Sequence, residues 1–115
     1  MPALFDTKVI FPVTGDSLLI TVKVHIQPST TRIFVDGSEF KSFAGDDETD
    51  LGDATKFKQK KIRVHTTIQD KSTNTDDIKA QHLAQYGDKM VKRVVNTTAS
   101  EEGELFDVFT DIMVF

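Results

Sequence analysis

Apolar and polar residues alternate along two long segments of this chain, 17–27 and 60–70. A period of two residues predicts a β-strand with one buried face. The apolar positions of the two segments are Leu18, Ile20, Val22, Val24, Ile26, Ile62, Val64 and Ile68. We therefore expect these side chains to lie in one hydrophobic core.

Tight-turn residues separate the extended segments. All six glycines lie directly beside an Asp or Glu, and glycine reaches positive φ at no steric cost. Asp36-Gly37, between the runs 31–35 and 38–43, predicts a hairpin with a type I′ turn. Gly15-Asp16 likewise predicts an opening hairpin between residues 5–13 and 17–27. We expect residues 45–53 to be a loop.

In the second half of the chain, the sequence pattern does not predict one secondary structure for every segment. Residues 78–86 are rich in helix formers and Gly87 can end a helix, but an all-β surrounding favours a strand, and both readings stay open. Residues 89–98 and 105–115 are predicted strands. The fold class expected is all-β, an antiparallel β-sandwich of about seven or eight short strands, with one short helix near residues 76–86 as the open alternative. Residues 1–115 form a single domain of this kind.

Composition restricts the function classes. The chain has 115 residues, no cysteine and a formal charge of −4, so thiolate metal sites and disulfides are ruled out and general attraction to nucleic acid or anionic lipid is disfavoured. No signal peptide or apolar run of membrane-spanning length is recognised, so we expect a soluble chain, with the cytoplasm as the default compartment. No segment matches the fingerprint of a known family.

The densest chemical cluster lies in the predicted loop 45–53, which holds five carboxylates and no cation. Calcium prefers several oxygen ligands from such a turn, and Asp46, Glu48 and Asp50 fit the first, third and fifth positions of an EF-hand loop. The match then fails, because Leu51 occupies the glycine position and Phe57 the position of the bidentate Glu. An irregular calcium site and a solvated acidic loop both remain open.

Other chemistry has weaker support. The cations Lys56, Lys58 and Lys60 share a face only if their segment is extended, and the single nearby aromatic lies on the opposite parity. His25 and His65 lie on the polar faces of their strands, and their rings can meet only if those strands are adjacent. No nucleophile motif or phosphate-binding glycine loop is present.

The last predicted strand is apolar on both faces. One face carries Phe106, Val108, Ile112 and Val114, and the other carries Leu105, Phe109, Met113 and Phe115, interrupted by Asp107 and Asp111. Both faces therefore need cover. A loop or the 78–86 segment can supply it within the chain, or another subunit can supply it from outside.

These residues favour a non-catalytic binding or assembly module, such as a structural subunit of a larger complex. We expect its partner to be another protein or a second copy of the chain. The predicted contact residues are Leu105, Phe109, Met113 and Phe115. One alternative is a calcium-assisted ligand-binding sandwich, for example one that binds carbohydrate. A second alternative is a small acid-base enzyme using carboxylates with His25 or His65. No cofactor is required by the sequence, calcium being the one candidate.

Overall fold

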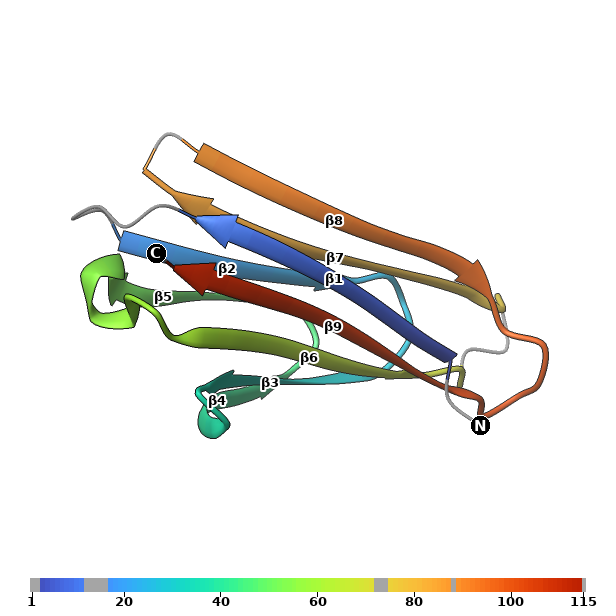
Figure 1. Cartoon of the computed structure of the whole chain (residues 1–115). Helices are drawn as coiled ribbons and strands as arrows, with labels where there is room; N and C mark the ends of the chain where they lie inside the picture. Colours follow the sequence, from blue (N-terminus) through green and yellow to red (C-terminus); the bar gives the residue numbers. More distant parts are fainter. Residues whose placement is uncertain (1–2, 12–16, 72–74, 88, 115) are drawn as a thin grey trace.

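The described part of the protein is all-β, with one short 3₁₀ helix (Figure 1). The computed structural model describes residues 3–11, 17–71, 75–87 and 89–114. The elements are β1 (Ala3–Phe11), β2 (Ser17–Val24), β3 (Ser29–Val35), β4 (Ser38–Ala44), β5 (Asp47–Asp53), η1 (Ala54–Phe57), β6 (Lys61–Gln69), β7 (Asp77–Tyr86), β8 (Lys89–Thr98) and β9 (Leu105–Val114). The predicted β-sandwich is confirmed.

Eight antiparallel strands form two packed sheets, ordered β9-β6-β3-β4 and β5-β2-β7-β8. β1 extends the first sheet to five strands by pairing in parallel with β9. The sandwich measures 45 × 26 × 20 Å, with its strands along the long dimension (Figure 1). β1 and β8 lie along one side of the sandwich, and β4 and β5 lie along the other.

Two predictions about the first half of the chain are wrong. β1 and β2 do not form an opening hairpin, because β1 pairs with β9 while β2 lies in the other sheet between β5 and β7. Residues 45–53 are not all loop, since Asp47–Asp53 is the edge strand β5. It pairs with β2 and buries Thr49 and Leu51, which are alternate residues of an otherwise acidic run.

The prediction of a type I′ turn at Asp36-Gly37 is confirmed. These residues have φ values of 48° and 84° and join β3 to β4. The open choice for residues 78–86 is decided in favour of a strand, β7. Its alternate residues Ile78, Ala80, His82, Ala84 and Tyr86 are buried, so the period is two and not that of a helix.

Six of the eight predicted core side chains are buried and Val24 is partly buried, but they are not all in one cluster, because Ile68 lies in a second one. Ile26 is the exception, because β2 ends at Val24 and Ile26 adopts a left-handed conformation that leaves it 61% exposed. Gln27 turns inward instead, and its side-chain amide donates a hydrogen bond of 3.0 Å to Asp70. The alternation of inward and outward side chains therefore does not continue past the end of β2. The prediction for Ile26 assumed that it did, and is wrong.

The core consists of two apolar clusters with a polar layer between them. One cluster includes Ile20, Val64, Ala84 and Ile112, and the other includes Ile68, Ala80 and Val108. On each of three strands, one inward-facing polar residue lies between a member of the first cluster and a member of the second. These residues are Thr66 on β6, His82 on β7 and Thr110 on β9.

A charge in the core should unfold the protein. Val22 is fully buried, so Val22→Asp places a carboxylate among apolar side chains and should lower the free energy of unfolding by several kcal/mol, on the order of 3–5. The exposed neighbour Lys23 points to the opposite face, and Lys23→Asp should change stability by about 0.5 kcal/mol or less. Urea denaturation followed by circular dichroism measures both. Equal midpoints for the two variants would contradict the burial pattern of β2.

Candidate functional site

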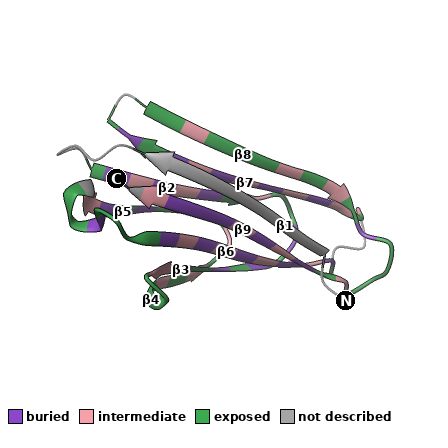
Figure 2. Cartoon of the chain, viewed as in Figure 1, coloured by how far each residue is buried: buried purple, intermediate pink, exposed green. Residues whose placement is uncertain are grey.

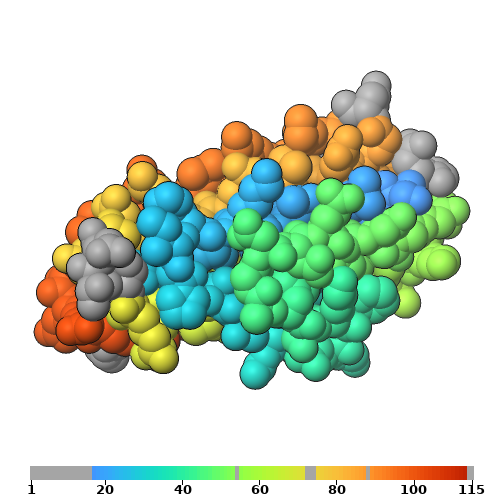
Figure 3. All heavy atoms as spheres, turned by 180° about the vertical axis from the view of Figure 1, so that it is seen from behind, coloured from blue at the N-terminus to red at the C-terminus, as the bar shows by residue number. Residues whose placement is uncertain are grey.

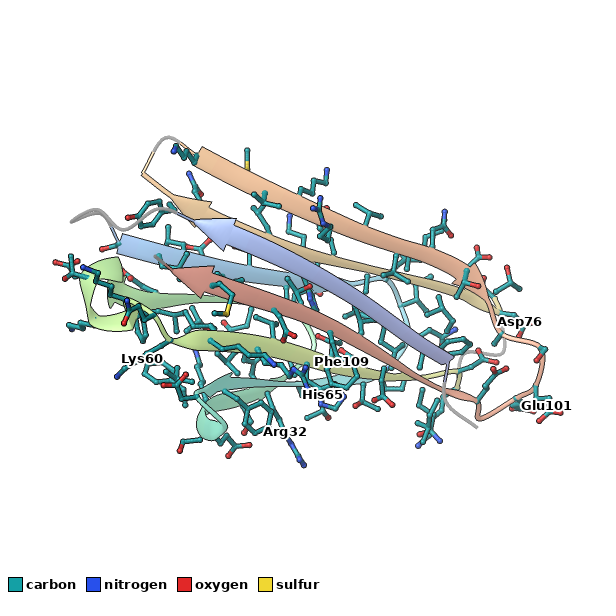
Figure 4. The ribbon with its side chains drawn as sticks, viewed as in Figure 1. Arg32, Lys60, His65, Asp76, Glu101 and Phe109 are labelled. Carbon is teal, nitrogen blue, oxygen red and sulfur yellow. The ribbon has the colours of Figure 1, made fainter. Side chains whose placement is uncertain are left out.

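A connected set of polar and aromatic side chains lies on the outer face of the five-stranded sheet. β6 and β9 are neighbours there, and three pairs of outward residues lie directly opposite each other: Arg63 with Asp111, His65 with Phe109, and Thr67 with Asp107. We call these six residues the β6–β9 face. Figure 4 shows His65 and Phe109 next to each other on this face, with Arg32 on the adjoining strand β3.

The negative charge of Asp111 is balanced by two cations of the same chain. The Arg63 guanidinium donates two hydrogen bonds to its carboxylate, of 2.8 and 3.0 Å, and the Lys61 ammonium lies 3.5 Å away. The hydrogen bonds from Arg63 lower the pKa of Asp111, and the positive charges of Arg63 and Lys61 add to this effect, while burial opposes it. A bidentate pair of this kind fixes the orientation of Arg63 as well as its charge.

The Phe109 ring contacts the two residues that point outward from β6 beside it. The His65 ring stacks on it with centroids 4.2 Å apart and planes inclined by 21°. The Arg63 guanidinium lies 4.9 Å from the ring centroid, within the range of a cation–π interaction. Phe109 remains only partly buried after these contacts. The ring is thus held in one orientation at the surface.

The carboxylate of Asp107 accepts from two residues of β6. His65 Nε2 and the Thr67 hydroxyl both lie 2.9 Å from Asp107 Oδ1, and Thr67 Oγ1 lies 3.3 Å from the same His65 nitrogen. In a catalytic triad the acid and the nucleophile occupy opposite ring nitrogens of the histidine. Here both partners share Nε2, so the geometry is that of a structural cluster and not of a proton relay to a nucleophile.

Two hollows lie on this face, and His65 lines both. One, of about 420 Å³, is bounded by residues of β3, β6 and β9 that include Arg32, Thr67 and Leu105. The other, of about 350 Å³, lies beside Phe34, Arg63 and Phe109. The surface around Phe109 therefore has relief into which side chains of another molecule can fit.

The predicted interface residues are brought onto one face in part. Leu105 is 42% exposed, and Phe109 and Met113 are partly buried at outward positions of β9. Phe115 lies outside the described residues. Asp107 and Asp111, which interrupt this apolar row, have partners on β6 of the same chain.

The three candidate calcium ligands do not converge. The carboxylate of Asp46 accepts the backbone N–H of Val24 at 2.7 Å, and that of Asp50 accepts the N–H of Gly52 at 2.8 Å. Glu48 is exposed on β5. Among the residues that the structure describes, no three His, Asp or Glu side chains gather into a group that could hold a metal ion.

The basic residues and the surface histidines are also separated. Lys56 and Lys58 do not share an extended strand with Lys60, because residues 54–57 form η1 and bury Phe57. His25 and His65 cannot meet across adjacent strands, because β2 and β6 lie in different sheets. The two rings therefore do not meet in one site.

His82 is the polar residue that the sequence analysis missed. It is buried, its Nε2 lies 2.7 Å from Thr66 Oγ1 and its Nδ1 lies 2.8 Å from Thr110 Oγ1. Thr66 Oγ1 also lies 2.8 Å from Thr31 Oγ1, so a chain of hydrogen bonds crosses the core from β7 to three strands of the opposite sheet. The signal available in the sequence was the alternation of residues 78–86, which places His82 among inward positions once the segment is read as a strand.

Burial governs the protonation of His82. Loss of solvation lowers its pKa from 6.5 to about 4, so the ring is neutral near neutral pH. A neutral imidazole has one donor and one acceptor nitrogen, which suits two threonine hydroxyls that can each donate or accept. The hollow beside it measures about 10 Å³, which is too small for a substrate.

Comparisons with known proteins gave no match. No protein-family model matches the chain, and neither the curated proteins nor the solved structures include one with significant similarity to it. No helix among the described residues is both long and apolar enough to cross a membrane.

The buried imidazole should make the protein sensitive to mild acid. Because the pKa of His82 is about 4 when folded and about 6.5 when unfolded, the unfolded state binds the proton first and stability falls as the pH drops from 6.5 towards 4. The loss should reach about 2 kcal/mol between about pH 7 and pH 5. Urea denaturation at the two pH values measures it.

The His82→Gln variant should be less stable at neutral pH but lose less stability on acidification, because glutamine has no proton to gain in this range. His25→Gln is the matched control, since His25 is exposed, and it should keep the pH dependence of the parent. If His82→Gln showed the parent's pH dependence unchanged, the acid sensitivity would have to come from another group.

Proposed function

We propose that this chain is a non-catalytic assembly module, a structural subunit that packs against a second copy of itself through the outer face of its five-stranded sheet. The observation that carries the proposal is the position of Phe109. It lies at the surface, held by His65 and Arg63, and it borders one of the two hollows on the same face. Ordered aromatic side chains beside pockets are typical anchors of protein interfaces.

The apolar residues of β9 extend this surface along the strand. Leu105 lines the larger hollow, and Met113 lies two positions beyond Asp111 on the same face. Aromatic residues and methionine are enriched at the centres of interfaces, where lysine and aspartate are depleted. The carboxylates that interrupt the apolar row are compatible with contact because each already has a partner.

Charge balance favours a second copy as the partner. The ion pairs on the outward side of β3, β4, β6 and β9 involve the cations Arg32, Lys61 and Arg63 and the carboxylates Glu39, Asp107 and Asp111, with His65 as the partner of Asp107. With the His65 imidazole uncharged, the three positive and three negative charges on the outward side of these four strands sum to zero. Two such faces can therefore meet about a two-fold axis without net repulsion, as isologous dimers require.

The alternatives have less support. An acid-base enzyme needs a histidine whose two nitrogens reach different partners at an accessible site, whereas His65 uses one nitrogen for both and His82 is buried. A calcium-assisted carbohydrate site needs converging oxygen ligands, whereas Asp46 and Asp50 are engaged with backbone N–H groups.

Removal of the Phe109 ring should weaken the self-association. Phe109→Thr keeps a strand-forming residue, so the fold should persist, but the anchor is lost and the dissociation constant of the dimer should rise by about 10-fold to 100-fold. Sedimentation equilibrium of parent and variant measures the change, and a thermal melt checks folding.

Phe40→Thr is the matched control, because Phe40 is 51% exposed on the edge strand β4, away from β6 and β9. It should leave the dissociation constant unchanged. If Phe109→Thr unfolded the protein, Phe109 would be a core residue. If it left the association of the parent unchanged, this face would not be the interface.

A further inference from the structure

The four-stranded sheet has two edges of opposite charge. β8 forms one edge and carries three cations and no carboxylate over residues 89–98, while β5 forms the other and carries four carboxylates and no cation over residues 47–53. Figure 3 looks onto this sheet, with β8 in orange along the top and β5 in green below the blue β2. Edge strands offer unpaired backbone N–H and C=O groups to another chain.

Several of these charges are free for a partner. Lys89, Lys92 and Arg93 are exposed, and none forms an ion pair with another described residue. On β5, Glu48 and Asp50 are exposed and have no cationic partner in the described part of the chain, whereas Asp47 is 2.9 Å from Lys41 and Asp53 caps η1. Figure 2 shows β8 exposed over most of its length, with no buried residue along it.

We propose that copies of this chain assemble head to tail, with β8 of one copy adding to β5 of the next, so that the four-stranded sheet continues from copy to copy. The occupant of each edge is thus a second copy of the chain. This contact uses a surface different from the β6–β9 face and does not depend on the function proposed for that face.

Strand direction suits this contact. Neighbouring strands in the order β5-β2-β7-β8 are all antiparallel, so β5 and β8 run in opposite directions. When copies repeat side by side in the same orientation, β8 of one copy therefore meets β5 of the next as an antiparallel pair. The backbone groups of both edges can then form the ordinary antiparallel ladder.

The side-chain register suits it as well. Directly opposed residues form one row across the sheet, from Glu48 through Thr21 and Leu83 to Lys92, so the two charges at the ends of this row lie on the same face. A repeat without a shift along the strands places Lys92 opposite Glu48 of the next copy. The irregularity in the pairing of β2 with β5 lies between Ser17 and Leu19 and leaves the segment 47–50 regular.

The same charges oppose the competing arrangements. A two-fold contact of β8 with β8 places its lysines against each other, and one of β5 with β5 places carboxylates against carboxylates, both of which are destabilising. Lysine at a sheet edge ordinarily prevents pairing between identical edges. Here that protection leaves only the unlike edges to pair, which is a heterologous contact that produces a ring or a filament.

Charge reversal at each edge tests the proposal. In one variant, Lys89→Glu and Lys92→Glu give β8 a net negative charge, and in a second, Glu48→Lys and Asp50→Lys reverse the two charges of β5 that have no cationic partner. Each variant alone then presents net unpaired charge of like sign at both edges and should need about tenfold higher concentration for half assembly. An equimolar mixture has unlike edges at every contact and should regain the assembly of the parent. Sedimentation velocity at about 50 mM and about 500 mM salt measures this, and the parent's assembly should weaken at the higher salt.

The matched control for the β8 variant is Lys23→Glu with Lys79→Glu, which changes the net charge by the same amount on the central strands β2 and β7 and should leave assembly intact. Thermal melts confirm that each variant is folded. The proposal is overturned if the parent is monomeric at low salt, if the reversed variants assemble like the parent, or if their mixture fails to assemble. Phe109→Thr alters neither edge, so failure of the β6–β9 face and failure of the edge contact appear in different variants.

Discussion

A chain of hydrogen bonds through the middle of the core ties the two sheets of this protein together. His82 of β7 reaches Thr66 and Thr110 on two strands of the opposite sheet, and Thr66 reaches Thr31 on a third. A buried polar group that loses its partner costs about 1–3 kcal/mol. Sliding one sheet over the other breaks several of these bonds at once, so the layer restricts the sheets to one relative register in a way that apolar contacts alone do not.

This layer also determines what the surface presents. Because side chains alternate along a strand, inward positions at Thr66 and Thr110 require that the residues beside them point outward. His65 and Phe109 are among those neighbours, and β6 and β9 are paired, so the two rings stack. The β6–β9 face is thus a direct consequence of the polar layer in the core, with the same strands supplying both.

Two surfaces of the sandwich differ in whether their charged side chains are paired within the chain. On the outward side of β3, β4, β6 and β9, the described charged side chains pair within the chain and leave apolar side chains and hollows between them. The edges of the four-stranded sheet hold unpaired charges of opposite sign and free backbone groups. The first surface suits contact by shape and apolar burial, which salt affects little, and the second suits contact by charge and backbone hydrogen bonding, which salt weakens.

Local features of the fold could be read from the sequence. The alternation in residues 17–27 and 60–70 identified the strands β2 and β6 and their buried faces, and Asp36-Gly37 identified a turn, because each depends on residues that are close in the chain. The outward row of Leu105, Phe109 and Met113 was identified for the same reason. Ile26 was misplaced because a strand end reverses parity, and nothing in the alternation marks where the strand stops.

The sequence by itself therefore determined that the chain is mainly a series of strands, which residues of two of these strands face inward, and that the last strand is apolar on both sides. Only the tertiary structure decided that β1 pairs with β9 and not with β2, that Asp111 meets Arg63, that His82 crosses the core, and that an acidic segment and a basic one lie at opposite edges of one sheet. The physical reason is the distance along the sequence between the residues that interact. Side-chain alternation and turn geometry are set by neighbours in the chain, whereas strand pairing depends on backbone groups far apart in sequence, whose choice of partner follows from the packing of the whole core.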